Sequence, residues 1–591
     1  MNEETQRRRR SNFANQEVWG PFVAIVLVLV GISSLFVLSI LSENNDPDHV
    51  HGDYVIVGGG PAGCSIAEIL SRDPTKQVYL IEAGPDNTGK APILDTVTPA
   101  SPFVSSSFMD RYFWQFAQEP AEVIPNRPDL RYTGGRELGG GTRVNGMQWV
   151  RGTDWNFEQW VDLTDDDLWN VTNVINAYME IEKYIGNTVD PTQRGTGGRL
   201  TVTDSMLAPP QTVPTSISEK YVTAVEQMTG LPRLDDYNKL EPNSRVGPFL
   251  RWQVTAKYGD TVTRESADLA FLTPDVLKRP NLHVITDAFV TKVLINKAKE
   301  AYGVQYIKEG KEKFAYARER VILSAGIQSP VILMHSGIGN ATYLESIGIK
   351  SVYDNPNVGI DAYNHQGMIL VFAKNSSDTI SDNPADIYES GAWLPDPNPD
   401  PELTPNSSPR RIQTIVINTP GVMLYGLIHV QPLKAGYVTI QDNNPLRPPL
   451  SSDRILVPPE GDIDWDSYVN AIKQYACKLR DEYKGFGVGP AVDPSYEMLN
   501  PPYSICSNDP ALYEYVRTHL ALQTYHWTST AKMGMEGDGI SVTNSRGSVW
   551  GVSKLTVADN SIIPHLHDGN TQAPAYLIGH VIGKELAAGR H

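Results

Sequence analysis

The segment YHWTSTAKMG, residues 525–534, places a histidine among aromatic and small polar residues near the C-terminal end. A neutral imidazole, with an unperturbed pKa of about 6.5, can accept a proton near neutral pH, so His526 is a candidate general base. Asn570 follows 44 positions later (570 − 526 = 44). Its amide cannot act as a base, but its NH₂ group can donate a hydrogen bond to an oxygen that gains negative charge. Taken alone, His526 fits a structural core histidine better than a base.

A glycine-rich turn near the start of the chain could bind a dinucleotide. An apolar run that is typical of a strand leads into Gly58-x-Gly60-x-x-Gly63, and a helical pattern follows within residues 53–70. The glycines permit a tight turn and a close approach of the backbone to a pyrophosphate, which then lies at the helix N-terminus. A second apolar run ends in Glu82, 19 residues after Gly63 (82 − 63 = 19), where a carboxylate can bind a ribose hydroxyl. This order predicts a Rossmann-type site without choosing between NAD and FAD.

The elements that position these residues must belong to more than one domain. The chain has 591 residues, whereas single hydrophobic cores stop growing at roughly 250 to 300 residues. The formal charge of −18, from 50 Lys and Arg against 68 Asp and Glu, disfavours binding to a polyanion by the globular part. We therefore expect a protein of two interleaved domains and no nucleic acid partner.

The first fifty residues predict a membrane anchor. Residues 21–41 carry no charged side chain, and about 20 apolar residues suffice to cross a bilayer as a helix. A cleaved signal peptide is the alternative, but its apolar region is usually only about 7 to 15 residues and ends at a small-residue site. The arginines at 7–10 favour a cytoplasmic N-terminus, with residues 42–591 on the lumenal or outer face. Four glycosylation sequons are compatible with that topology, although about four are expected by chance: Asn170, Asn340, Asn375 and Asn406.

The three cysteines predict no metal site and at most one disulfide. Cys64, Cys477 and Cys506 match no zinc-ligand spacing. Cys64 lies inside the glycine motif, where a small buried residue is needed. Cys477 and Cys506 are therefore the only plausible partners, and the sequence leaves open whether they are bridged.

A second glycine-rich stretch, GGRELGGGTRVNGMQWVRG at 134–152, identifies a family resemblance. It resembles the first signature of the glucose/methanol/choline (GMC) oxidoreductases, which are FAD-dependent flavoproteins that oxidise alcohols. A second signature is approximated at 324–339, and the similarity extends from about residue 53 to the end of the chain. The matching positions of the first signature are Gly135, Arg136, Leu138, Gly139, Gly140, Thr142, Val144, Asn145, Trp149 and Gly152.

The resemblance implies an FAD site. In covalently flavinylated members a histidine of the first glycine-rich loop holds the flavin, and Asn145 follows GGGTRV in this chain. An asparagine cannot form that bond, so we expect non-covalent FAD. The cofactor-binding residues implied by the motif and the resemblance are Gly58, Gly60, Gly63, Glu82, Gly139, Gly140, Thr142, Asn145, Val290 and Asp559.

The resemblance also assigns a role to His526. In the family, a histidine in an H-x-x-G-T-x-x-M-G segment takes the hydroxyl proton of the substrate, and a His or Asn about forty residues later bonds the same oxygen. HWTSTAKMG fits this pattern, with Ser529 in the usual glycine position, and Asn570 has the spacing of the partner. His565 and His567 are alternatives that the motif does not align. His365 resembles a structural histidine of the family, with an expected role in anchoring a loop.

The resemblance implies an α/β fold in which a Rossmann-type FAD-binding domain is interleaved with an α+β substrate-binding domain, after one N-terminal transmembrane helix. The expected substrate is a small-molecule alcohol, with dioxygen or another electron acceptor as second substrate. The implied division of the chain is a basic cytoplasmic tail at 1–20, the anchor at 21–41, a linker at 42–52, the FAD-binding domain at 53–160, 263–350 and 545–591, and the substrate domain at 161–262 and 351–544.

Two other functions stay open at this level. The chain could be a non-catalytic structural protein that retains the fold and FAD, because some large viruses use GMC-type proteins as virion components. A related light-driven decarboxylase would need a cysteine in the cavity strands, and none occurs between 65 and 476. The proline-rich stretch 394–411 predicts a surface loop or a lid over the alcohol site. The alternating pattern at 427–445 predicts strands that back the substrate cavity.

Overall fold

The computed structural model describes most of the chain from residue 48 to its end. The predicted anchor, 21–41, lies outside the described residues, as do Asn375, Asn406 and most of the proline-rich stretch. Among the helices that are described, none is long and apolar enough to cross a membrane. The described residues are 48–87, 111–118, 134–186, 190–205, 216–241, 246–258, 262–373, 388–398, 410–419, 422–452, 462–485, 498–519 and 522–591.

The first sheet has seven strands, and its centre is parallel. The strand order is β10-β11-β12-β1-β2-β9, with β24 paired to β12. The parts of β1 and β2 that pair with each other, residues 54–57 and 78–81, are apolar and almost entirely buried, as a parallel sheet between two layers requires. This is the Rossmann-type arrangement expected for a dinucleotide site. The strands are β1 (His49–Val57), β2 (Val78–Ile81), β9 (Leu282–Ile285), β10 (Phe289–Ile295), β11 (Ala301–Lys308), β12 (Lys311–Leu323) and β24 (Leu555–Val557).

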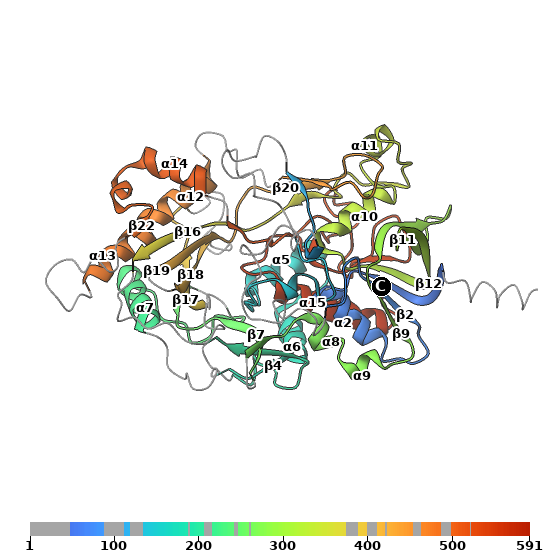
Figure 1. Cartoon of the computed structure of the whole chain (residues 1–591), viewed down its shortest axis with the longest axis horizontal. Coiled ribbons are helices and arrows are strands. Elements are labelled where there is room, and N and C mark those ends of the chain that lie inside the picture. Colours follow the sequence, from blue (N-terminus) through green and yellow to red (C-terminus); the bar gives the residue numbers. More distant parts are fainter. Residues whose placement is uncertain are drawn as a thin grey trace, which may run out of the picture.

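Two helices pack closely beside this sheet (Figure 1). They are α2 (Pro61–Leu70), which follows the first glycine turn, and α15 (Gln572–Ala587), which begins just after Asn570. Gly579 allows the contact, because a Cβ atom there would lie 2.5 Å from the Cα of Ala62. The packing therefore carries the start of α15, with Asn570, to the first sheet.

The second sheet is antiparallel and carries the wall of the site. Its order is β22-β16-β19-β18-β17-β6, with β23 paired to β16. One face is packed under helices α7 (Ser216–Thr229), α12 (Ile463–Ala471) and α14 (Asp509–His519), which lie on the outer side of the sheet in Figure 1. The other face turns toward the rest of the molecule. The strands are β6 (Gly247–Phe249), β16 (Gln366–Ala373), β17 (Tyr388–Pro395), β18 (Arg411–Thr419), β19 (Val422–His429), β22 (Met498–Asn500) and β23 (Leu522–Gln523).

Smaller sheets join the two larger ones. One has the order β4-β5-β7-β8, one β15-β20-β21-β3, and one consists of β13 and β14. Their bounds are β3 (Ala117–Gln118), β4 (Glu182–Tyr184), β5 (Leu200–Asp204), β7 (Gln253–Tyr258), β8 (Val262–Arg264), β13 (Ile338–Gly339), β14 (Tyr353–Asp354), β15 (Ile360–Ala362), β20 (Gly436–Thr439) and β21 (Leu450–Ser452). The other α-helices are α5 (Asp154–Thr164), α6 (Val171–Ile181), α8 (Ala267–Phe271), α9 (Pro274–Leu277), α10 (Ser329–His335), α11 (Ala341–Ser346) and α13 (Lys478–Gly485).

The cysteines behave as their positions in the sequence suggest. Cys477 and Cys506 form a disulfide, which settles the pairing that the sequence left open. Cys64 is free and fully buried in α2, where its Sγ lies 3.1 Å from the carbonyl oxygen of Gly59. It fills the small space behind the glycine turn.

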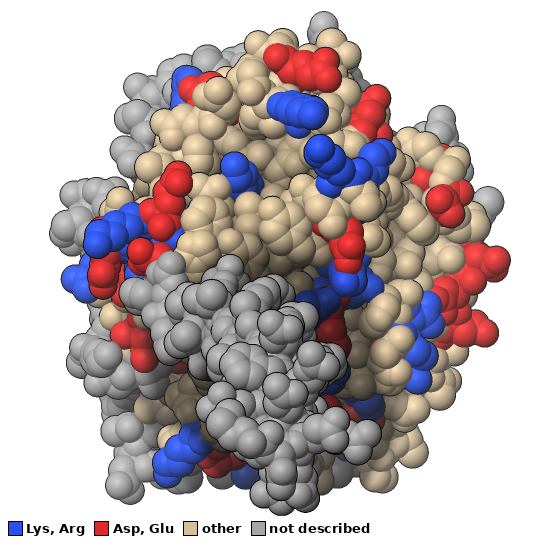
Figure 2. Space-filling model, turned by 90° about the vertical axis from the view of Figure 1, so that its right-hand side faces the viewer, with Lys and Arg blue, Asp and Glu red and all other residues tan. Residues whose placement is uncertain are grey.

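The surface at the end of the molecule near β11 and β12 mixes charges of both signs. Figure 2 shows that basic and acidic side chains are interspersed on this face. The described residues there form no continuous basic patch of the kind that binds polyanions.

Candidate active site

The first glycine turn leaves an open space at the start of α2. Gly58 has a φ of +100°, and a Cβ atom on Gly63 would lie 1.9 Å from the carbonyl oxygen of Gly58, so both positions require glycine. Gly60, the N-cap of α2, has no heavy atom within 4 Å of its would-be Cβ atom. The first N–H groups of α2 therefore face an unfilled space that can take a pyrophosphate.

The second glycine-rich loop borders the same space. The Gly139 N–H donates to the carbonyl oxygen of Gly59 across 2.7 Å, and a Cβ atom on Gly140 would lie 2.9 Å from the Cα of Gly60. Gly139 and Gly140 both have positive φ, which glycine adopts without strain. Gly141, like Gly60, faces open space. Both loops thus leave room where a dinucleotide would lie.

Two buried carboxyl groups stand at this space. Glu82 accepts hydrogen bonds from the N–H groups of Gly59, at 2.7 Å, and Gly84, at 2.8 Å. Asp559 accepts from the hydroxyl group of Ser329, at 2.6 Å, and from the N–H of Gly326, at 2.9 Å. Burial raises the pKa of both carboxyl groups above its usual value. Each carboxyl group fixes a glycine-bearing loop. Glu82 retains lone pairs that can accept hydroxyl groups of a cofactor, whereas the second oxygen of Asp559 also accepts from the N–H and the hydroxyl group of Ser561.

Three of the other predicted cofactor residues are engaged within the protein. The hydroxyl group of Thr142 donates to the carbonyl oxygen of Gly139 at 2.6 Å, so it holds the second glycine loop. The amide of Asn145 donates to Gln572 at 2.8 Å and accepts from Arg264 at 2.8 Å. Val290 is buried in β10, so only its backbone can reach a cofactor. These residues support the shape of the site rather than offer free side-chain groups to it.

The structure brings His526 and Asn570 together. The Nδ2 atom of Asn570 lies 3.4 Å from Nε2 of His526. The His526 segment is fixed beside β16, because the N–H of His526 donates to Oδ1 of Asn364 at 2.9 Å and the N–H of Thr528 donates to the carbonyl oxygen of Tyr363 at 3.0 Å. Asn570 is supplied by the segment directly before α15.

A chain of hydrogen bonds determines which nitrogen of His526 is bare. Nε2 of His365 lies 3.0 Å from the carbonyl oxygen of Val430, and Nδ1 of His365 lies 2.8 Å from Nδ1 of His526. A carbonyl oxygen only accepts, so a neutral His365 carries its proton on Nε2 and has a bare Nδ1. His526 must then donate from Nδ1, which leaves its Nε2 as an acceptor that faces Asn570. The hydrogen-bond network thus prepares Nε2 of His526 to take a proton.

Electrostatics keep both imidazoles neutral. Burial, followed by the neighbouring His365 and His567, lowers the pKa of His526 well below its usual value. Burial lowers the pKa of His365 to about 3. The His526 side chain nevertheless retains some accessible surface, as does Asn570. A partly desolvated imidazole that is still accessible can act as a base toward a substrate.

Two glutamines hold the Asn570 amide in one orientation. Gln148 accepts from Nδ2 of Asn570 at 2.8 Å, and Gln413 donates from Nε2 to Oδ1 of Asn570 at 3.1 Å. Both contacts place the NH₂ group of Asn570 on the side of His526. Sequence reasoning missed Gln148, Gln413 and the contact between His365 and His526, because single polar residues from distant parts of the chain give no motif. His365 resembles a structural histidine of the family and was expected to anchor a loop. Its ring also contacts the candidate base, His526.

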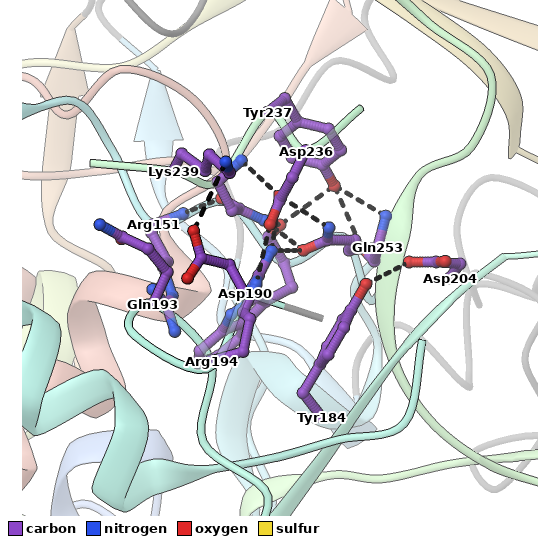
Figure 3. Close-up of polar contacts among 12 residues, drawn as sticks. Arg151, Tyr184, Asp190, Gln193, Arg194, Asp204, Asp236, Tyr237, Lys239 and Gln253 are labelled. Carbon is purple, nitrogen blue, oxygen red and sulfur yellow. Dashed lines mark hydrogen bonds and ion pairs between the residues drawn. The ribbon is translucent and has the colours of Figure 1, made fainter. Parts of the chain in front are cut away.

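A buried polar network supports the segment that carries Gln148. Arg151 donates to Glu182 at 2.6 Å, and Arg194 donates to Asp236 at 2.6 Å (Figure 3). Asn238 accepts from the N–H of Arg151 at 2.7 Å and donates to the carbonyl oxygen of Trp149 at 2.8 Å. Charged groups are tolerated in such a place only when each is paired and hydrogen-bonded. The network therefore locks the backbone on both sides of Val150, next to Gln148.

The two alternative histidines also contact groups outside this pair. His567 is fully buried, with Nε2 3.4 Å from the carbonyl oxygen of Val150. The ring of His565 lies 6.4 Å from that of Trp155. Among the described residues, no group of three or more His, Cys, Asp or Glu side chains is placed to hold a metal ion.

Known proteins share the fold and the sequence pattern of this chain. A formate oxidase from Aspergillus oryzae, whose solved structure concerns FAD modification, superposes with a TM-score of 0.76 and 21% identity over 92% of this chain and 99% of the oxidase. An oxygen-dependent choline dehydrogenase from Sinorhizobium fredii is 29% identical, with coverage of 91% of this chain and 97% of the dehydrogenase. An alcohol dehydrogenase (acceptor) from Pseudomonas putida is 28% identical, with coverage of 89% and 94%.

The profile of one enzyme family matches both halves of the chain. Its N-terminal part matches residues 52–366, and its C-terminal part matches residues 432–579. The matched regions include both glycine-rich loops, His526 and Asn570. The chain belongs to the GMC oxidoreductase family.

Proposed function

We propose that this protein oxidises an alcohol to an aldehyde or ketone, with His526 as the base and FAD as the bound cofactor. The observation that carries the proposal is the pairing of a bare, neutral Nε2 on His526 with the NH₂ group of Asn570, 3.4 Å away. A substrate hydroxyl group between them would give its proton to His526. The NH₂ group of Asn570 would donate a hydrogen bond to the same oxygen as negative charge develops there.

FAD fits the space between the two glycine-rich loops. Gly60 and Gly141 are open on that side, the N-terminus of α2 can bind the pyrophosphate, and Glu82 can accept hydroxyl groups of the ribose. Both sides of the Asn145 amide are occupied by protein groups, which supports non-covalent binding. When bound, FAD supplies the hydride acceptor, and dioxygen or another electron acceptor restores it.

Reduction of the flavin without oxygen tests this function. The full-length protein, purified in detergent and loaded with FAD, is mixed anaerobically with primary, aryl and sugar alcohols while the flavin absorbance is recorded. Bleaching by at least one alcohol, with formation of the matching carbonyl compound, is the expected result. A flavin-loaded protein that no alcohol reduces would favour a structural protein that only retains the fold.

We infer further that residues 21–41 anchor the protein in a membrane, with the N-terminus in the cytoplasm and the catalytic domain on the lumenal or extracellular side. The charge-free segment behind four arginines supports this topology. The disulfide between Cys477 and Cys506 also favours an oxidising compartment. Full-length protein should stay with membranes after an alkaline carbonate wash, and sealed vesicles should protect the catalytic domain from external protease. Release by the wash would contradict the anchor.

A further inference from the structure

The face of the second sheet that the helices leave uncovered starts at His526 and Asn570, the proposed catalytic pair. Gln413 of β18 donates to Asn570, and His365, directly before β16, contacts His526. Side chains at every second residue of a strand share one face. From these positions the same face therefore continues along β16 and β18, and along β19 between them.

Apolar side chains follow one another along this face. In the row next to the catalytic pair, Gly367 pairs with Ile428, which pairs with Gln413. The next row is Ile369, Gly426 and Ile415, and the third is Val371, Leu424 and Ile417. Successive rows lie roughly 7 Å apart, because a strand rises about 3.4 Å per residue. The three rows contain one polar side chain, Gln413, and no charged side chain.

This apolar wall, defined by Ile369, Val371, Leu424 and Ile417, is only half-buried. The residues that alternate with the wall, such as Leu370 and Tyr425, are fully buried under the helices. Ile369, Val371 and Leu424 belong to none of the three hydrophobic cores formed by the described residues. Ile428 and Ile415, in the rows nearer His526 and Asn570, are buried in a hydrophobic core, and Ile417 packs against that core. Ile369, Val371 and Leu424 follow Gly367 on the same face and remain partly accessible. Accessible aliphatic side chains in such a place can form a binding surface.

We propose that the apolar wall binds the hydrocarbon part of the substrate, which is an alcohol with an extended apolar body and its hydroxyl group at one end. This assignment rests on the proposed function, because the hydroxyl group must lie between His526 and Asn570. The continuity of the wall with Gln413 selects this occupant over a segment of the chain itself. A cationic group would find no counter-charge on the wall, so a quaternary ammonium alcohol is a poor substrate.

Affinity should then rise with the length of the hydrocarbon. Each methylene group that leaves water for an apolar site tightens binding about fourfold. The experiment uses full-length, FAD-loaded protein in detergent and measures anaerobic flavin reduction by straight-chain primary alcohols of increasing length, with choline as the charged probe. The rate constant divided by the dissociation constant is expected to climb several-fold per added carbon and to level off when the chain outgrows the wall.

Substitutions in the wall separate this proposal from the function on which it rests. Leu424→Gln is expected to lower the rate constant divided by the dissociation constant by at least tenfold for long alcohols, with FAD still bound. The dependence on chain length then becomes flatter. Leu446→Gln is the matched control, because Leu446 is 60% exposed and lies in another part of the molecule. If Leu424→Gln does not fold, Val371→Thr keeps the side-chain shape and introduces one hydroxyl group.

The outcomes are distinguishable. Equal reduction by short, long and charged alcohols would overturn the wall assignment and leave the alcohol oxidation intact, and it would show that other parts of the chain cover this face. Unchanged chain-length dependence in both Leu424→Gln and Val371→Thr would overturn it as well. A flavin that no alcohol reduces would overturn the proposed function and the wall together.

Discussion

The two imidazoles of the site depend on each other through a single N–H···N contact. His365 fixes the proton of His526 on Nδ1, since its own Nε2 is bound to the carbonyl oxygen of Val430. Without this contact, His526 could carry its proton on either nitrogen, and part of the enzyme would present an N–H to the substrate in place of a base. His365 is therefore a positioning residue: it sets the tautomer of His526 and does not itself contact the substrate.

Replacing His365 tests this dependence. His365→Leu is expected to slow flavin reduction by about five- to tenfold, the effect of one lost hydrogen bond of about 1–1.5 kcal/mol. His365→Gln can accept from His526 and donate to Val430, so it should restore most of the rate. Stopped-flow measurements at equal FAD occupancy give the rate of flavin reduction in both variants. His519→Leu, at an exposed position of α14, is the control. Equal rates in the Leu and Gln variants would contradict the tautomer assignment.

The pH dependence follows from the environment of His526. Burial lowers its pKa, and the base is active when neutral, so activity is retained above the folded-state pKa and lost only as the pH falls below it. The rate of flavin reduction should therefore stay level between pH 8 and about 6.5, the ordinary pKa of histidine, and its acid limb should lie lower. Rates measured across this range, with FAD occupancy checked at each pH, test the point. A midpoint at or above 6.5 would argue against a buried neutral base.

At the scale of elements, two glycines of the turn before α2 have different roles: Gly60 leaves room for the cofactor, and Gly63 is needed for folding. A methyl group on Gly60 meets no atom within 4 Å, whereas one on Gly63 would lie 1.9 Å from the carbonyl oxygen of Gly58. Gly60→Ala should therefore fold with stability within about 0.5 kcal/mol of the original but bind FAD at least tenfold more weakly. Gly63→Ala should lose stability and soluble yield. Thermal unfolding of the apoproteins and FAD titration distinguish the two, and normal FAD affinity in Gly60→Ala would place the pyrophosphate elsewhere.

The same elements show what the sequence could and could not predict. The order of strand, glycine turn, helix and second strand was readable, and so was the His526 motif, because neighbouring residues form these patterns. The antiparallel sheet that brings His365 beside His526, 161 positions apart, has no local signature. Gln148 and Gln413 likewise reach Asn570 from distant parts of the chain. These contacts depend on the pairing of segments that are far apart in the sequence, and a local sequence motif carries no information about that pairing.

At the scale of the whole molecule, the buried network around Glu182 ties the cofactor side to the substrate side. Glu182 binds Arg151 and lies 3.4 Å from Arg194, and all three side chains are fully buried. Glu182→Gln would leave guanidinium charge without its partner in the interior, which costs about 3 to 5 kcal/mol. Glu514→Gln, which removes an exposed pair with Arg517, should cost no more than about 1 kcal/mol. Thermal unfolding of both variants checks the contrast, and equal stability would mean that the network is not needed for the fold.

A membrane anchor and an apolar wall would both favour hydrocarbon-rich alcohols as substrates. Hydrocarbon-rich alcohols partition into bilayers, so a catalytic domain held near a membrane would meet them at higher concentration than in water. The anchor stays a prediction, since residues 1–47 lie outside the described residues. The boundaries of the interleaved domains also stay predictions.

The most direct test of the central claim is the rate of anaerobic flavin reduction in His526→Ala, compared with the original protein at equal FAD occupancy and with an alcohol that reduces the original. FAD is expected to stay bound, and reduction is expected to slow by at least about 100-fold, the scale of a lost general base. A variant that reduces its flavin at a near-normal rate would show that His526 does not take the hydroxyl proton.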